Sequence, residues 1–163
     1  MKKILFTVLF ISSYSSLCHG SSLVGRLGIG ATNHLESKMP AISLKLQRNR
    51  SSALGGHFAM DSSSNGLDYA LGIKGYRYIY EEPQLNFYSA LAGTYFTYTN
   101  EADDKTEQGY QIDGTFGAEF SFQGLESVGF SFEFGIGLSE YQKETHLKTV
   151  GHNMMVSAVH FYL

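Results

Sequence analysis

The chain has 163 residues, which is enough for one domain of ordinary size. Its 11 tyrosines, 12 phenylalanines and 18 glycines, with only 17% charged residues, exclude a charged tail protein and argue against a helical bundle. A formal net charge of −3 gives no basis for expecting nucleic acid as a partner.

The N-terminal segment has the organisation of a secretory signal peptide. Lys2 and Lys3 supply positive charge, and residues 4–11 form an apolar core that is too short to cross a membrane as a helix. We therefore expect residues 1–20 to be a signal peptide and residues 21–163 to be the mature domain. That domain has ten basic and fifteen acidic residues, a net charge of −5. The only cysteine lies in the signal segment, so disulfides do not stabilise the mature domain.

Apolar and polar residues alternate most regularly along two stretches of the chain, residues 110–122 and 128–138. In the first stretch, Phe116 lies on the face opposite Asp113 and Glu119. A helix with this pattern would carry charge all around its surface, whereas a strand separates the two sets onto opposite faces. The alternation therefore predicts β-strands.

The same alternation, less regular elsewhere, predicts eight strands along the mature domain. Their ranges are 22–31, 39–47, 52–60, 66–79, 85–98, 109–122, 128–141 and 152–163. In the fifth strand the sequence does not show which face is the apolar one, because Tyr88 and Phe96 lie on one face and other apolar residues lie on the opposite face. Short connections follow the second, fourth and sixth strands, and longer polar loops are expected after the first, fifth and seventh. Short turns at one end and loops at the other are typical of an up-and-down meander.

Alternation alone does not say which face meets solvent. A soluble lipocalin-like barrel would place the phenylalanines inside around a lipophilic ligand, and a membrane barrel would place them outside against lipid. Glycines concentrate on the polar face, where a narrow barrel interior needs small residues. Tyrosines gather near predicted strand ends, as in an interfacial aromatic girdle: Tyr76, Tyr78, Tyr80, Tyr95, Tyr98, Tyr110, Tyr141 and Tyr162. Strands of up to about 14 residues exceed the roughly 9–11 that a tilted membrane strand needs. These observations favour an all-β, eight-stranded antiparallel up-and-down transmembrane barrel.

The signal peptide, the eight amphipathic strands and the final alternation resemble the small eight-stranded outer-membrane barrels of the OmpA/OmpX type. The residues of that final alternation are Met155, Ser157, Val159, Phe161 and Leu163. The resemblance covers the whole mature chain and implies a monomer in the cell outer membrane, in contact with outer-membrane lipid and lipopolysaccharide. It also implies that the barrel-assembly machinery reads the C-terminal strand. In that family the strand usually ends in Phe, and here it ends in Leu163.

Under this interpretation, charged and lipid-facing side chains separate onto the two faces. The expected interior charges are Arg26, Lys45, His57, Asp68, Lys74, Asp113, Glu119 and Glu133. The expected lipid-facing residues are Phe116, Phe120, Phe130, Phe132, Phe134 and Ile136. Because buried charge is costly unless paired, we expect Glu119 and Glu133 to pair with basic residues of this interior set. A gated ion path is the alternative, and eight strands exclude a wide pore.

No strong catalytic or metal-binding pattern is present. His34, Asp61 and Ser62 fall in two expected outer loops and faintly resemble the outer-membrane lipid A palmitoyltransferase. The acidic stretch 100–108 matches no calcium-loop spacing. The leading hypothesis is therefore a non-enzymatic barrel, without cofactor or metal, that maintains envelope integrity or presents its polar loops for surface interaction. The alternatives are a secreted lipocalin-like barrel and a lipid A acyltransferase.

Overall fold

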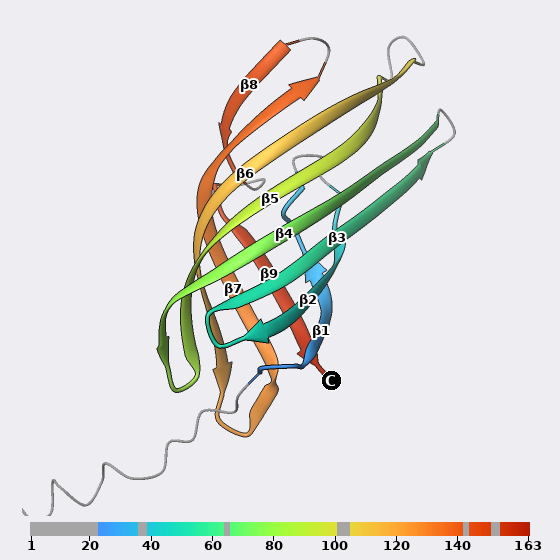
Figure 1. The fold of residues 1–163 in the computed structure, drawn as a ribbon. Coiled ribbons are helices and arrows are strands. Elements are labelled where there is room, and N and C mark those ends of the chain that lie inside the picture. Colours follow the sequence, from blue (N-terminus) through green and yellow to red (C-terminus); the bar gives the residue numbers. More distant parts are fainter. Residues whose placement is uncertain (1–22, 36–38, 64–65, 101–104, 142–143, 151–153) are drawn as a thin grey trace, which may run out of the picture.

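The computed structural model describes residues 23–35, 39–63, 66–100, 105–141, 144–150 and 154–163. The expected signal peptide lies outside the described residues. The described residues form nine strands and contain no helix long and apolar enough to cross a membrane. In chain order (Figure 1), the strands are β1 (Leu27–Thr32), β2 (Ala41–Asn49), β3 (Ser52–Ser63), β4 (Gly66–Glu82), β5 (Leu85–Asn100), β6 (Lys105–Phe122), β7 (Leu125–Tyr141), β8 (Glu144–Thr149) and β9 (Val156–Tyr162).

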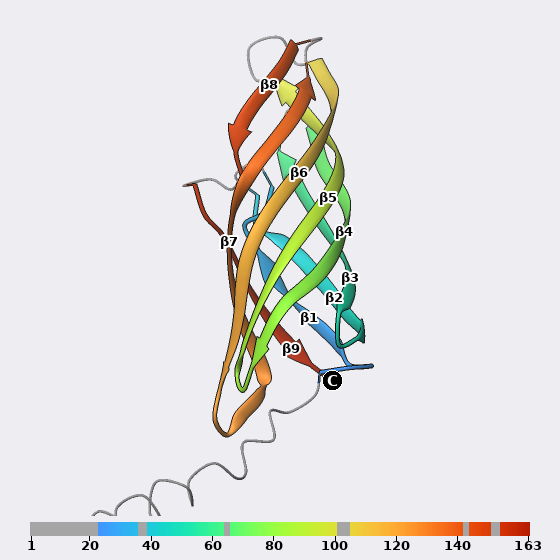
Figure 2. The ribbon, with the colours of Figure 1, turned by 60° about the vertical axis from the view of Figure 1, so that its left-hand side comes forward.

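The strands close into an antiparallel barrel. Each strand from β1 to β7 pairs with the next one along the chain, and β9 then pairs with both β7 and β1. Figures 1 and 2 show the closed wall from two sides. The expected all-β, eight-stranded up-and-down barrel is confirmed, because the nine strands occupy eight positions in the wall.

Two strands share the eighth position of the wall. β9 pairs with the lower part of β7, from Val128↔Phe161 to Glu133↔Val156, and β8 pairs with its upper part, residues 136–141. The chain leaves the ladder between them, where Met154 has a positive φ of 65°. The strand that the sequence placed at 152–163 is β9, which begins at Val156, and most of the loop expected over 142–151 is the strand β8.

The wall of the barrel is uneven in height. β4 to β7 have 16 to 18 residues each, whereas β1 has 6 and β2 has 9. Figure 1 shows the β3–β4 and β5–β6 hairpins rising beyond the upper ends of β1 and β2. The loop predicted over 99–108 is mostly strand, because β5 continues to Asn100 and β6 begins at Lys105. The long hairpins therefore project beyond the short strands at one end of the barrel.

The first strand begins later than the sequence predicts. Before β1, Gly25 has a φ of 81°, a left-handed conformation that glycine adopts without steric cost. Its backbone N–H donates to the Gln47 carbonyl (2.7 Å), and the Arg26 N–H donates to the Leu23 carbonyl (3.0 Å). This turn occupies residues that alternation alone assigned to a strand.

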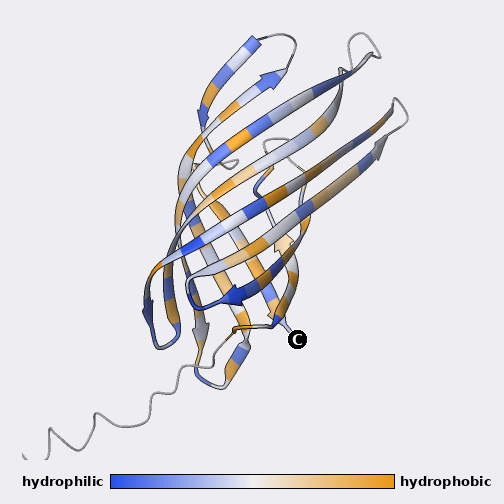
Figure 3. Cartoon of the chain, viewed as in Figure 1, coloured by the Kyte–Doolittle hydropathy of each residue, from blue (hydrophilic) through white to orange (hydrophobic). Residues whose placement is uncertain are grey.

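The alternation in the sequence is an alternation between the inside and the outside of the barrel. Figure 3 shows hydrophobic and hydrophilic residues following one another along the strands. On β6 the side chains of Asp113 and Glu119 are buried, and that of Phe116 is 68% exposed. On β5 the ambiguous facing is resolved, since Tyr88 points inward and Leu91 points outward. The burial pattern is the inverse of that of a soluble protein.

Glycines on the inner face make room for large neighbours. A Cβ atom added to Gly72 would collide with the His57 ring, and one added to Gly137 would collide with the Asp113 carboxylate. At the outward-facing Gly75 and Gly93, an added Cβ would meet nothing within 4 Å. The inner glycines therefore let the charged interior pack within a narrow barrel.

Candidate functional site

The barrel interior is filled by polar and charged side chains from facing strands. Those that the sequence placed inside and that the structure buries to 5% exposure or less are Lys45, His57, Lys74, Asp113, Glu119 and Glu133. They come from β2, β3, β4, β6 and β7. Because a buried charge is stable only when it is paired and hydrogen-bonded, the partners of each determine what the interior can do.

The upper part of the interior is organised around the Glu133 carboxylate. Glu133 Oε2 forms an ion pair with Lys74 Nζ. The Tyr88 hydroxyl donates to Oε1 (2.9 Å), and the Thr115 hydroxyl donates to Oε2 (2.8 Å). The four side chains come from β7, β4, β5 and β6, so this carboxylate ties four strands together.

His34 joins this group from the segment that follows β1. Its side chain is 1% exposed, with Nε2 at 2.9 Å from Asp113 Oδ2 and Nδ1 at 3.3 Å from Lys74 Nζ. A neutral ring protonated on Nε2 satisfies both contacts, since it donates to the carboxylate and accepts from the ammonium. The Gln111 amide donates to both oxygens of the same carboxylate at 2.8 Å. His34 lies in the connection after β1, where the sequence placed it, but its side chain is buried inside the barrel instead of facing solvent.

The lower part of the interior is organised around a second ion pair. Lys45 Nζ lies 2.7 Å from Glu119 Oε2, and the Tyr162 hydroxyl donates to the other oxygen of this carboxylate. The Lys45 ammonium also lies 4.5 Å from the ring centre of Tyr76 and 4.8 Å from that of Tyr88. These aromatic faces add cation–π attraction to the ion pair.

Three of the tyrosines expected in the aromatic girdle belong to this interior. Tyr76, Tyr78 and Tyr162 are 3–7% exposed and point into the barrel. Tyr76 and Tyr78 lie on β4 at the same inward-facing parity as Lys74, and Tyr162 lies on β9 at the parity of the buried His160. This alternation places them inside despite their position near a strand end. Tyr80 and Tyr110 face outward, and Tyr95 and Tyr141 are half-buried.

The remaining predicted interior residues take no direct part in the two ion pairs. His57 bonds the Thr94 hydroxyl at 2.8 Å, and Asp68 accepts a hydrogen bond from Thr99 at the upper end. Arg26 lies at the lower end, where its guanidinium donates to the carbonyls of Tyr162 and Leu163 and to the Ser127 hydroxyl. Arg26 therefore links the C-terminal strand to the start of β7.

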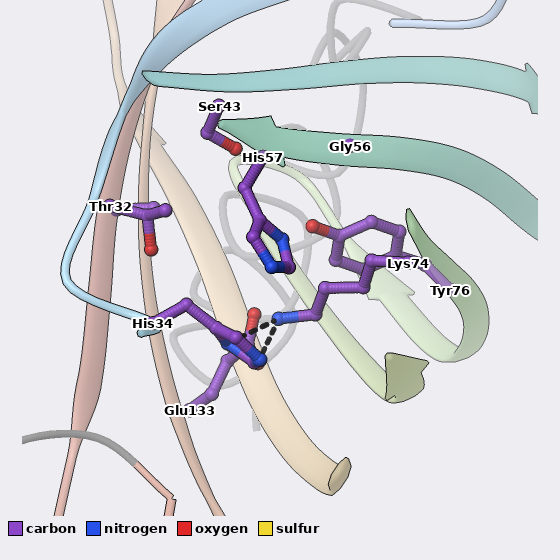
Figure 4. Close-up of a pocket in the computed structure, with 9 residues that line it drawn as sticks. Thr32, His34, Ser43, Gly56, His57, Lys74, Tyr76 and Glu133 are labelled. Atoms are coloured by element: carbon purple, nitrogen blue, oxygen red, sulfur yellow. Dashed lines mark hydrogen bonds and ion pairs between the residues drawn. The ribbon is translucent and has the colours of Figure 1, made fainter. Parts of the chain in front are cut away.

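A small cavity lies beside the upper ion pair. Figure 4 shows the Lys74 side chain pointing between His34 and Glu133, with His57 on the opposite side of the space. The cavity has a volume of about 10 Å³, which is room for one water molecule. It cannot hold a lipophilic ligand.

The outer face carries the apolar side chains. Of the predicted lipid-facing residues, Phe116, Phe132, Phe134 and Ile136 are 37–68% exposed, and Phe120 and Phe130 are half-buried against each other and their aromatic neighbours. The Phe120 and Phe130 rings stack with centroids 5.7 Å apart. All six project from β6 and β7 on the side away from the ion pairs.

The residues considered for acyl transfer do not form one site. Asp61 and Ser62 are exposed on β3, whereas the two ring nitrogens of His34 contact Asp113 and Lys74 inside. Among the described residues, no three His, Cys, Asp or Glu side chains are arranged to hold a metal ion. Most of the acidic cluster of the fifth loop, residues 101–104, lies outside the described residues.

Sequence reasoning missed several partners of the buried charges. Tyr88 and Tyr162 complete the two carboxylate sites. The signal available in the sequence was the two-residue spacing, which places Tyr88 on the same face as Ala90 and Tyr162 on the same face as His160, both buried in the structure. His34 had no such signal, because it follows the end of its strand.

Comparison with solved structures gives a match of the same architecture. The crystal structure of the N-terminal β-barrel domain of Pseudomonas aeruginosa OprF aligns with a TM-score of 0.63 and 12% identity, covering 86% of this chain and 98% of that one. The chain has the fold of the OprF barrel domain. The expected resemblance to small eight-stranded barrels is thereby confirmed at the level of the fold. No protein-family model and no curated protein sequence matches the chain.

Proposed function

We propose that this chain is a monomeric, non-enzymatic β-barrel of the outer membrane. The observation that carries the proposal is the apolar belt on the outside of every position in the wall. It includes Ile29, Leu44, Leu54, Ile73, Leu91, Phe116, Phe134 and Phe161, each more than 40% exposed. Soluble monomers rarely expose apolar patches larger than a few hundred Å², whereas hydrocarbon accommodates such a belt. A closed barrel also satisfies its backbone hydrogen bonds internally, as lipid requires.

The interior supports a structural role over a transport role. Lys45 and Lys74 are each neutralised by a carboxylate on a facing strand, and the described cavity holds one water molecule. These ion pairs join strands across the described interior, and a barrel of eight strands is too narrow for a wide path. This arrangement supports a barrel that maintains envelope integrity.

The projecting upper hairpins support a second role in surface interaction. Exposed polar side chains there include Asp61 and Ser62 on β3 and Glu144, Thr145 and Lys148 on β8. In outer-membrane barrels the longer end faces the cell exterior and the short turns face the periplasm. We propose that this end meets lipopolysaccharide and molecules outside the cell, and that the barrel-assembly machinery reads β9 from the other end.

Both alternatives from the sequence lose their structural basis. A lipocalin-like carrier needs an apolar interior, and the interior described here is charged. An acyltransferase that used His34 with Ser62 needs the two side chains in one site, and His34 is buried inside the barrel whereas Ser62 is exposed.

The deciding experiment is fractionation of the native envelope, followed by gel migration of the outer-membrane fraction with and without boiling. The proposal predicts recovery in that fraction and a migration that changes on boiling, as a closed barrel unfolds. Recovery without detergent as a soluble species would contradict it. Unchanged lipid A acylation after deletion of the gene is the corresponding expectation for a barrel without enzymatic activity.

A further inference from the structure

All four arginines of the chain lie at one end of the barrel, the end with the short turns and the C-terminus. Arg26 is engaged with the C-terminal strand. The other three are Arg48 at the end of β2, Arg50 in the β2–β3 turn and Arg77 on β4. All three are exposed. Arginine is thus confined to the end that the proposed orientation places at the periplasm.

The sheet register brings these three residues together. Ser52 at the start of β3 pairs with Asn49 on β2 and with Arg77 on β4. Arg48 and Arg77 therefore flank β3 from its two sides, about 10 Å apart at the backbone for two strand spacings. Arg50 lies in the turn directly below. Figure 3 shows the end of β2 as strongly hydrophilic, next to apolar stretches of the same wall.

None of these three guanidinium groups has an ion pair or a side-chain hydrogen bond among the described residues. The contrast with the interior is sharp, because Lys45 and Lys74 are each matched to a carboxylate. Above the cluster on the outer face lie Leu46 and Leu54, which are 43% and 61% exposed. The cluster therefore borders the apolar belt, at the depth where lipid headgroups begin if the belt lies in hydrocarbon.

The chemistry of this cluster fits a phosphate. A guanidinium presents paired N–H donors whose geometry matches phosphate oxygens, and it remains charged at any physiological pH. Long basic side chains at a membrane boundary extend toward the headgroups while their stems cover apolar surface. Three such groups on one outer face provide a site for an anionic headgroup.

We propose that Arg48, Arg50 and Arg77 bind the phosphate of an anionic phospholipid in the leaflet at the short-turn end. The inference rests on the proposed membrane location and adds a specific lipid contact to it. The ligand is a lipid headgroup rather than a soluble phosphate, because the cluster borders the apolar belt and the acyl chains can lie along that belt. Such a lipid would link β2, β3 and β4 at the lower rim.

The test is a lipid titration of the folded barrel monitored by native mass spectrometry, with phosphatidylglycerol and phosphatidylcholine as the two probes. The wild type should retain phosphatidylglycerol in preference to phosphatidylcholine. One basic residue near an anionic surface changes affinity about fivefold. The triple variant R48Q/R50Q/R77Q should therefore bind phosphatidylglycerol on the order of 100-fold more weakly, since the three factors multiply.

Two control variants separate the cluster from general charge. K148Q removes a cation at the opposite end, and E81Q/E82Q removes two exposed carboxylates at the same end. Neither should weaken phosphatidylglycerol binding. R77K keeps the charge without the paired donors and should give an intermediate loss. Each variant is first tested for a change of gel migration on boiling, and if the triple variant does not fold, R77K and the single substitutions replace it.

Three results would overturn the inference. Equal retention of both lipids by the wild type would show that the cluster does not select an anionic headgroup. An unchanged affinity in the triple variant would place the contact elsewhere. Displacement of the lipid by millimolar glycerol phosphate as effectively as by phosphatidylglycerol would identify a soluble-anion site. A wild type that folds only as a soluble species would remove the proposed function and this inference together, whereas the first three results leave the membrane barrel intact.

Discussion

Removal of the Glu133 carboxylate should destabilise the barrel more than any other single truncation in its upper interior. Glu133 is 2% exposed and receives hydrogen bonds from Tyr88 and Thr115 in addition to its ion pair with Lys74. In Glu133→Ala, the Lys74 ammonium keeps the His34 ring at 3.3 Å and the face of the Tyr76 ring at 5.2 Å as neighbours, and neither carries a compensating negative charge. Breaking a buried pair while leaving one charge behind costs about 3–5 kcal/mol. We expect a loss of about 4 kcal/mol, because water entering the enlarged cavity offsets part of the cost of the two orphaned hydroxyls.

The assay is urea unfolding of the purified barrel in detergent, followed by far-ultraviolet circular dichroism and by the fraction of protein with folded gel migration. Glu133→Gln is the matched variant, since it keeps the shape of the side chain and one oxygen acceptor while it removes the charge and the second acceptor. The double variant K74M/E133L should lie within about 2 kcal/mol of the wild type, because replacing both partners by apolar groups removes the unpaired charge. A Glu133→Ala variant that unfolds within about 0.5 kcal/mol of the wild type would refute the reasoning and mean that the carboxylate is solvated.

Three other substitutions test the wall itself. Gly30→Ala should lower the yield of folded barrel, because the added Cβ would collide with the backbone of β9, whereas Gly93→Ala has open space and should fold normally; folded gel migration reports both. Arg26→Ala should lower the free energy of unfolding by about 1–2 kcal/mol in the same urea assay, because its hydrogen bonds to the C-terminal strand are lost. An unchanged midpoint would mean that water replaces these hydrogen bonds at no cost. Phe116→Arg should cost about 2–4 kcal/mol in lipid vesicles and Phe122→Arg, near the turn, about 0–1; equal costs would contradict a lipid belt.

Much of the architecture follows from the period of two in the sequence. On β6 and β7 each apolar residue alternates with a polar one, so the positions of Asp113, Glu119 and Glu133 on one face required no tertiary information. The pairing of each carboxylate did require it. Whether a given glutamate pairs with Lys45 or with Lys74 depends on the register of the strands and on their stagger around the barrel. Alternation within one strand does not specify either of these.

Three features of the structure lack a signal in the sequence. His34 lies two residues beyond the end of β1, among polar residues that show no alternation of apolar and polar types, although in the structure it continues the inward parity of Thr32. The division of the eighth position into β8 and β9 depends on a short departure of the chain from the ladder. Tyr76 and Tyr78 are aromatic residues of the kind expected at a membrane interface, but the alternation places them on the inward face. Their packing around Lys45 accounts for the inward location.

The uneven wall has a consequence for how the barrel opens. β1 meets β9 only from Gly28↔Tyr162 to Thr32↔Ala158, whereas β5 and β6 are joined from Leu85↔Phe120 to Asn100↔Lys105. Local opening costs least free energy where few backbone hydrogen bonds must break together. Amide hydrogens along the β1–β9 seam should therefore exchange with solvent deuterium sooner than those in the middle of β5 and β6. Because β1 pairs with β2, and β9 with β7, through only six residue pairs each, transient opening should centre on these two short strands and leave the long β4–β7 part of the wall closed.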